Sequence, residues 1–118
     1  MKKHGFSAAE HLKRRSDFEA TYKLRRSAAD ERLVVYARPN GLDFSRLGLS
    51  VSGRLGNAVE RNRFKRRVRE AFRLHKHELP KGFDFIVIPR KRLGRTVEEI
   101  YDSLSMLTAK LCDGEADS

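Results

Sequence analysis

The sequence predicts a single α+β domain, an α/β sandwich in which helices pack on a mixed sheet. Three observations predict it. The 118 residues are enough for one hydrophobic core without a disulfide or a structural metal. Capping patterns mark three helix starts, and short β-branched segments lie between them. The resulting order of helix, strands, helix, strand, helix is typical of one sheet with helices packed on it.

The helix starts are predicted from capping boxes, in which a capping side chain precedes by three residues a Glu that reaches back to the cap amide. The pairs are Ser16 with Glu19, Asn57 with Glu60, and Thr96 with Glu99. The last helix is expected from Val97 to about Cys112, and residues 113–118 to fray. Its apolar stripe should pack against the sheet, and comprises Val97, Ile100, Tyr101, Leu104, Leu107 and Leu111.

Three strands can be read from the sequence. Residues 32–38 (RLVVYAR) and 46–52 (RLGLSVS) flank the turn former Pro39-Asn40-Gly41, which predicts an antiparallel hairpin. Residues 83–89 (FDFIVIP) are too apolar and too short for anything but a largely buried strand. The connection from the second strand to this one is long enough for a crossover, which general rules predict to be right-handed.

The net charge of the protein narrows the classes of partner that it is expected to bind. A net charge of +10 and a pI near 10.3 favour an anionic partner such as RNA, DNA or an acidic membrane surface. Membrane is the least favoured, because no run of about 18 apolar residues exists and the first residues lack the apolar middle of a secretion signal. The single Cys112 fits a reducing compartment. We therefore expect a cytoplasmic protein.

The segment from Asn57 to Arg73 (NAVERNRFKRRVREAFR) predicts an amphipathic helix with a cationic face. Between Arg61 and Arg73, seven of thirteen residues are Arg or Lys, and only Glu60 and Glu70 interrupt the basic residues of the segment. A merely solvated helix face usually interleaves both signs, so same-sign clustering favours a bound nucleic acid. At helical spacing, the apolar side holds Phe64, Val68, Ala71, Phe72 and His75, and the opposite side holds Asn62, Arg66, Arg69 and Arg73.

The first helix does not show a simple one-sided burial pattern. Phe18 taken alone is best interpreted as a core residue. Tyr22 lies one turn further along the helix, near Arg25, and Tyr36 follows on the first long strand. Aromatic side chains beside cations are what single-stranded RNA binders use to stack bases while holding the backbone.

These residues carry a resemblance to a known family. The block from Gly53 to Arg73 (GRLGNAVERNRFKRRVREAFR) resembles the protein component of bacterial ribonuclease P. Further support comes from Asp17-Phe18, Tyr22, residues 33–36 and residues 48–52. The similarity spans roughly residues 11–111. It implies one domain over residues 1–118, ordered from about 11 to 112 with short flexible tails. It also implies the element order α-β-β-β-α-β-α, a four-stranded mixed sheet and, against the general rule, a left-handed crossover through the basic helix.

The resemblance further implies a function. The family's protein is the small subunit of a ribonucleoprotein that removes the 5′ leader of precursor tRNA, and the catalyst is a large RNA that binds Mg²⁺. We therefore expect no catalytic residue and no metal ligand on the protein, and a monomeric free protein. Expected contacts to the catalytic RNA are Arg54, Arg61, Asn62, Arg63, Lys65, Arg66, Arg69 and Arg73. Expected contacts to the leader are Phe18, Tyr22 and Tyr36; Tyr22 departs from the family, where a Phe is frequent at this position.

Three other functions compete with this one. A nuclease acting through its own side chains would need clustered carboxylates or paired histidines, whereas Asp43 and Asp84 are isolated and His75 and His77 lack further ligands. A major-groove DNA binder would need base-reading side chains on a dimeric or arm-bearing scaffold, and no dimer signal is present. A ribosomal or ribosome-associated RNA binder would have the same size, pI and fold, so this alternative stays open.

Overall fold

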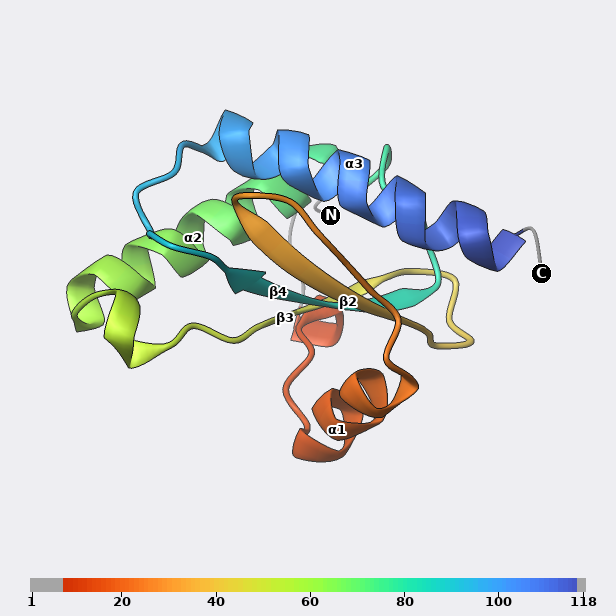
Figure 1. Ribbon diagram of the computed structural model, residues 1–118. Helices are drawn as coiled ribbons and strands as arrows, with labels where there is room; N and C mark the ends of the chain where they lie inside the picture. Colours follow the sequence, from red (N-terminus) through yellow and green to blue (C-terminus); the bar gives the residue numbers. More distant parts are fainter. Residues whose placement is uncertain (1–7, 117–118) are drawn as a thin grey trace.

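A four-stranded sheet lies at the centre of the molecule, with two helices on one face and one on the other (Figure 1). The computed structural model describes residues 8–116, with side chains as far as Cys112. The helices are α1 (Arg15–Leu24), α2 (Ala58–His75) and α3 (Val97–Ala116), the strands β1 (Ser27–Ala29), β2 (Leu33–Pro39), β3 (Arg46–Leu49) and β4 (Phe83–Pro89), and the 3-10 turns η1 (Ala8–Glu10) and η2 (Gly53–Leu55). The predicted α+β class and the order α-β-β-β-α-β-α are confirmed.

The predicted hairpin between residues 32–38 and 46–52 is wrong. The strands lie in the order β1-β2-β4-β3, so β4 separates β2 from β3. β4 runs antiparallel to β2 and parallel to β3, and the partner of β2 in a tight hairpin is the three-residue β1. The turn residues do form a turn, since Asn40 Oδ1 accepts the amide of Leu42 at 2.8 Å and Gly41 has a φ of +75°. The most apolar strand, β4, lies inside the sheet between β2 and β3, where both its edges are paired.

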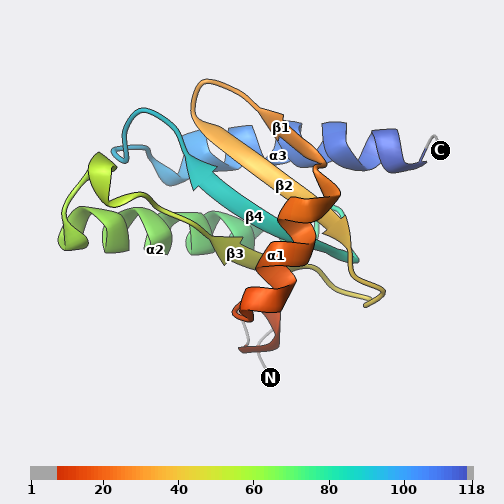
Figure 2. The same ribbon diagram turned by 60° about the horizontal axis from the view of Figure 1, so that its bottom comes forward.

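The connection from β3 through α2 to β4 is a left-handed crossover, as the resemblance implied and against the general preference. Figure 2 views the sheet from the α1 side: β4 points to the upper left, β3 lies below it, and α2 lies behind the sheet. Seen from the α2 side with the strands pointing up, β4 is therefore to the left of β3. This hand brings α2 along the β3 edge, next to α3 on the same face.

Two of the three predicted capping boxes form. Asn57 and Glu60 exchange side-chain to backbone hydrogen bonds of 2.9 Å each, and Thr96 and Glu99 exchange bonds of 3.1 and 3.0 Å. The box at Ser16 is wrong, because α1 begins two residues earlier than that box predicts, with Arg14 in place of Ser16 as an N-cap that makes no side-chain bond. α3 continues to Ala116, beyond its predicted end, and residues 117–118 of the expected tail lie outside the described residues.

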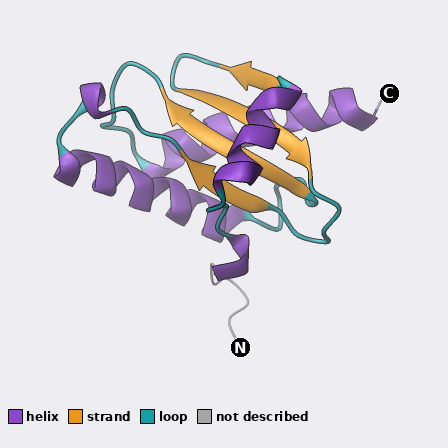
Figure 3. Cartoon of the chain, turned by 90° about the horizontal axis from the view of Figure 1, so that it is seen from below, coloured by secondary structure: helices purple, strands orange, loops and turns teal. Residues whose placement is uncertain are grey.

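The core fills the space between the sheet and the pair α2 and α3. The predicted apolar faces supply it: Phe64, Val68, Ala71 and Phe72 from α2, and Ile100, Leu104, Leu107 and Leu111 from α3 are buried. Strand β2 alternates, with Leu33, Val35 and Ala37 facing this core and the residues between them facing α1. Figure 3 shows α1 crossing that second face, which it covers only in part.

Candidate nucleic-acid interface

The cationic face of α2 is held in place by its cap and its buried stripe. Glu60, the acid that precedes the basic residues, is used by the helix start, since its Oε1 accepts the amide of Asn57 at 2.9 Å. Phe64 and Val68, exposed by 1% and 0%, anchor the opposite side in the core. The basic side chains between these anchors must therefore point outward, which is the physical reason that this helix presents charge to solvent.

The predicted RNA contacts lie on η2 and around the solvent-facing sides of α2, and they differ in exposure. Arg54, Asn62, Arg63, Arg66 and Arg69 are exposed, and Arg61, Lys65 and Arg73 are half-buried. Arg73 Nη2 lies 2.6 Å from Glu70 Oε2, so its charge is already compensated. The hydrogen bond and charge of Glu70 raise the pKa of the Arg73 guanidinium. Arg73 is therefore the predicted contact that would have to exchange a partner to bind phosphate.

The three predicted leader contacts, Phe18, Tyr22 and Tyr36, come together on the other face of the sheet as an aromatic cluster. The ring centroids of Tyr22 and Tyr36 lie 4.9 Å apart at 84°, an edge-to-face contact, and those of Phe18 and Tyr22 lie 6.4 Å apart. All three side chains are half-buried. Phe18 is seated on Gly48, because a Cβ at that position would lie 2.7 Å from its Cζ. The Phe18 ring is thus held against the sheet, while all three rings of the cluster stay partly accessible.

A hollow at the β3 edge connects the cationic face of α2 with the aromatic cluster. Its volume is about 150 Å³, and its lining includes His11, Lys13, Phe18, Gly48, Lys65 and Arg69. β3 is an edge strand that packs against α2 on one face and meets Phe18 of α1 at Gly48 on the other, so side chains of both helices lie around it. Burial, followed by the charges of Arg69 and Lys13, lowers the pKa of His11, while Glu10 opposes them.

Sequence reasoning did not identify the part that His11 and Lys13 play in this β3-edge hollow. They precede α1 in the chain, and only the bridge between His11 and Leu47 brings them to β3. A short polar segment carries no periodicity that would predict this pairing.

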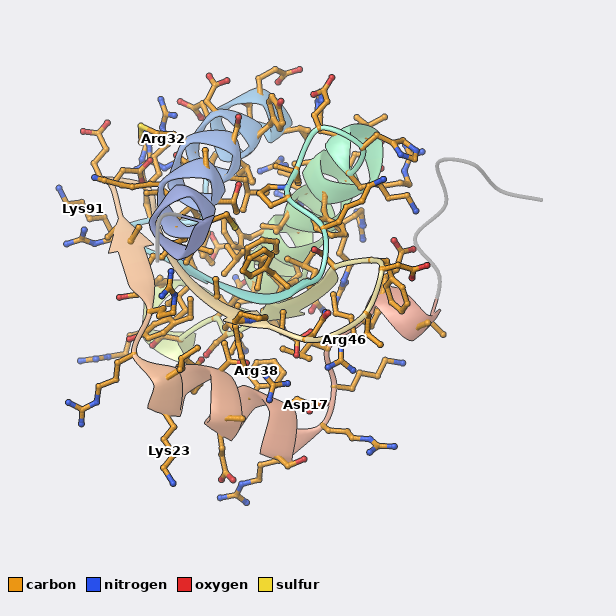
Figure 4. All side chains as sticks on the ribbon, turned by 90° about the vertical axis from the view of Figure 1, so that its right-hand side faces the viewer. Asp17, Lys23, Arg32, Arg38, Arg46 and Lys91 are labelled. Atoms are coloured by element: carbon orange, nitrogen blue, oxygen red, sulfur yellow. The ribbon has the colours of Figure 1, made fainter. Side chains whose placement is uncertain are left out.

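A buried charged network, also missed, holds α1 to the sheet beside the aromatic cluster. The Asp84 side chain is fully buried and accepts two 2.7 Å bonds from Arg46, one of 2.7 Å from Arg38 and one of 3.0 Å from Asn40. Asp17 of α1 approaches Arg38 at 3.4 Å and Arg46 at 3.7 Å. Figure 4 shows these two arginines and Asp17 gathered between α1 and the sheet.

The network decides the ionisation of Asp84. Burial acts to raise the pKa of this carboxyl, but the bonds from Arg46, Arg38 and Asn40 together outweigh burial, so the pKa lies below its ordinary value. An acid inside the apolar strand 83–89 was the available sequence signal, because a buried carboxylate requires partners. We conclude that Asp84 is a structural anion and that its oxygens are already used.

Among the residues that the structure describes, no three His, Cys, Asp or Glu side chains come close enough to hold a metal ion together. In the same part of the chain, no helix is both long and apolar enough to cross a bilayer.

Fold and surface together define a class of small basic α+β proteins, whose left-handed crossover passes through a cationic helix and whose opposite sheet face carries an aromatic cluster. A family model described as Ribonuclease P matches residues 6–112, so the chain belongs to the ribonuclease P protein family. It is 47% identical over 95 residues to the ribonuclease P protein component of Thermotoga maritima, covering 80% of this chain and 81% of the relative. The relative from Staphylococcus carnosus is 46% identical over 97 residues, which are 81% and 84% of the two chains.

Solved structures agree with this assignment. The RNase P protein of Staphylococcus aureus superposes with a TM-score of 0.75 at 40% identity, covering 87% of this chain and 94% of that one. The RNase P protein from Thermotoga maritima gives a TM-score of 0.74 at 40% identity, covering 82% and 96%. The fold and family implied by the sequence are thereby confirmed, whereas the residue-level contacts to RNA stay predictions.

Proposed function

We propose that this protein binds the catalytic RNA of ribonuclease P through α2 and the 5′ leader of precursor tRNA through the aromatic cluster, and so assists leader removal in the cytoplasm. The observation that carries the proposal is the continuous route around the β3 edge. Lys65 and Arg69 on α2 share a hollow with Phe18, the first ring of the cluster. An RNA strand in this hollow would contact cationic side chains and an aromatic ring at once, the combination that single-stranded RNA binders use.

The protein's contribution follows from charge and from differential binding. Two RNAs must approach within a Debye length, about 8 Å at physiological salt, and their phosphates repel each other. The exposed guanidinium groups of Arg66 and Arg69 would neutralise phosphates at that junction. Stacking on Tyr22 and Tyr36 would add an interaction that mature tRNA, which lacks a leader, cannot make. Precursor is thereby favoured over product.

Within residues 8–112, whose side chains the structure describes, no three His, Cys, Asp or Glu side chains lie close enough together to hold Mg²⁺. Mg²⁺ prefers carboxylate and water oxygens in octahedral geometry, and the buried carboxylate of Asp84 already accepts hydrogen bonds from Arg46, Arg38 and Asn40. We propose that the RNA holds the metal, and that the phosphate neutralisation by α2 lowers the Mg²⁺ concentration needed for cleavage. No proton transfer or nucleophilic step is assigned to a side chain of the protein.

Reconstitution tests the proposal. The purified protein is added to its cognate catalytic RNA, and precursor tRNA cleavage is followed at low Mg²⁺. We expect faster cleavage and tighter binding of precursor than of mature tRNA. The Lys110→Gln variant removes one positive charge at an exposed position away from the proposed contacts, so it serves as a control and should behave as wild type. A ribosomal RNA binder would give no gain in cleavage, and that result would overturn the proposal.

A further inference from the structure

A second hollow lies on the side of α2 that faces the connection between β4 and α3. It has a volume of about 250 Å³, and three of its lining residues are arginines: Arg63 and Arg67 from α2, and Arg92 from the connection. Figure 2 shows this connection beside the turn that precedes α2, and Leu55 of η2 lines the same hollow. Arg63 and Arg67 are one helical turn apart and therefore point to the same side.

The charges in this hollow are poorly compensated. Within the described residues, no carboxylate lies within 4.0 Å of a guanidinium nitrogen of Arg63, Arg67 or Arg92. Glu60 also lines the hollow, but its Oε1 is bound to the amide of Asn57. The lining holds three cations and one anion, Glu99 outside it also acts electrostatically on Arg92, and apolar Leu55 and Leu93 complete the wall. Such walls lower the local dielectric and strengthen attraction for an anion.

The backbone that presents Arg92 is itself strained. Lys91 has a φ of +67°, which is uncommon outside glycine, and the amide of Arg92 donates to the carbonyl of Arg90 at 2.7 Å. Conformations of this kind are energetically unfavourable and tend to persist where they aim a functional side chain. Here the turn brings Arg92 over the same hollow as Arg63 and Arg67.

We infer that Arg63, Arg67 and Arg92 bind one phosphate group of the catalytic RNA, so that α2 lies between two RNA backbones. The inference rests on the proposed function and extends it. Guanidinium groups match phosphate oxygens in bidentate geometry, and three of them around one hollow suit a single tetrahedral anion. Lys65 and Arg69 line the β3-edge hollow on the opposite side of α2, toward the leader contacts. The catalytic RNA would then contact α2 on two sides, through Arg69 beside the β3-edge hollow and through this phosphate site, with Arg67 and Arg92 as contacts not expected from the sequence.

The test measures affinity for the catalytic RNA against salt concentration for the double variant Arg67→Gln/Arg92→Gln. If both side chains hold one phosphate, the slope of log affinity against log salt should fall in magnitude by about 0.7 to 0.9. A fall of about twice that size, or a loss of affinity for the precursor leader alone, overturns the inference. Arg67 also donates to the carbonyl of Arg95 at 3.3 Å, so its replacement can affect the fold as well as the phosphate site. The single variant Arg92→Gln, at an exposed position, is therefore measured too, and melting temperatures are recorded for the single and the double variant.

Two further variants separate failure of this inference from failure of the proposed function. Lys110→Gln, which loses one charge as Arg69→Gln does, should leave the slope unchanged. Arg69→Gln should reduce it if α2 contacts RNA at all. An unchanged slope for Arg67→Gln/Arg92→Gln beside a reduced slope for Arg69→Gln removes only the phosphate site. Unchanged slopes for both remove the proposed function as well.

Discussion

The network around Asp84 allows a quantitative prediction for Asp84→Asn. Asparagine keeps the shape of the side chain, but it removes the negative charge and replaces one acceptor oxygen with a donor. That donor would face Arg38 or Arg46, both of which now point nitrogen atoms at Asp84 from 2.7 Å. The side chain is fully buried, so water cannot take over the lost bonds.

The magnitude follows from the burial of each partner. Removing one partner of a buried ion pair typically costs about 3 to 5 kcal/mol. The side chains of Arg38 and Arg46 are 25% and 22% exposed, and Asp17 lies beside both, so part of their charge stays solvated or paired. We therefore expect a loss of about 3 kcal/mol in the free energy of unfolding. For a domain of this size that loss lowers the melting temperature by roughly 10 to 15 °C.

The same network predicts how the free energy of unfolding changes with pH. Because the pKa of Asp84 lies below its ordinary value of 3.8, the stabilisation is complete above that value and is lost as the pH falls through the folded-state pKa. Urea unfolding followed by circular dichroism should show a constant difference between wild type and Asp84→Asn near neutrality, and a smaller one in acid. Arg15→Ala, which removes an exposed pair with Glu19, should change little. A difference below about 1 kcal/mol at neutral pH, or one that grows on acidification, would refute the reasoning.

The remaining predictions concern the core, the aromatic cluster and α2. Phe64→Ala should destabilise the fold by about 3 to 5 kcal/mol, since the ring is 1% exposed, while Val59→Ala at a 63% exposed position of the same helix should not; similar losses in urea titrations would contradict the packing argument. Tyr36→Ala and Tyr22→Ala should weaken binding of precursor tRNA by about 1 to 3 kcal/mol per stacked base and leave mature tRNA unaffected; equal losses for both RNAs would exclude leader stacking. Arg69→Ala should lower the salt slope of catalytic-RNA binding by up to about one, whereas an unaltered slope would argue against a phosphate contact.

Local chemistry explains which elements could be read from the sequence. The caps at Asn57 and Thr96, the buried stripe of α2 and the apolar strand 83–89 each depend on residues close in the chain. The hairpin failed because Pro39-Asn40-Gly41 predicts a turn correctly but does not identify which strand lies next to β2. That choice depends on β4, more than forty residues further on, whose pairing with both neighbours buries the most apolar surface.

In the candidate site, too, some features could be predicted from the sequence and others could not. The sequence by itself determined the chemistry: the cationic ladder of α2, the aromatic residues of α1 and β2, and a family block long enough to identify the class. Only the tertiary structure decided that Lys13 meets Arg69 at the β3 edge, that Arg92 joins Arg63, and that Asp84 is satisfied by Arg38 and Arg46. Periodicity and capping act over a few residues, whereas these groupings join segments far apart in the chain, which only the packed sheet and its left-handed crossover bring into contact.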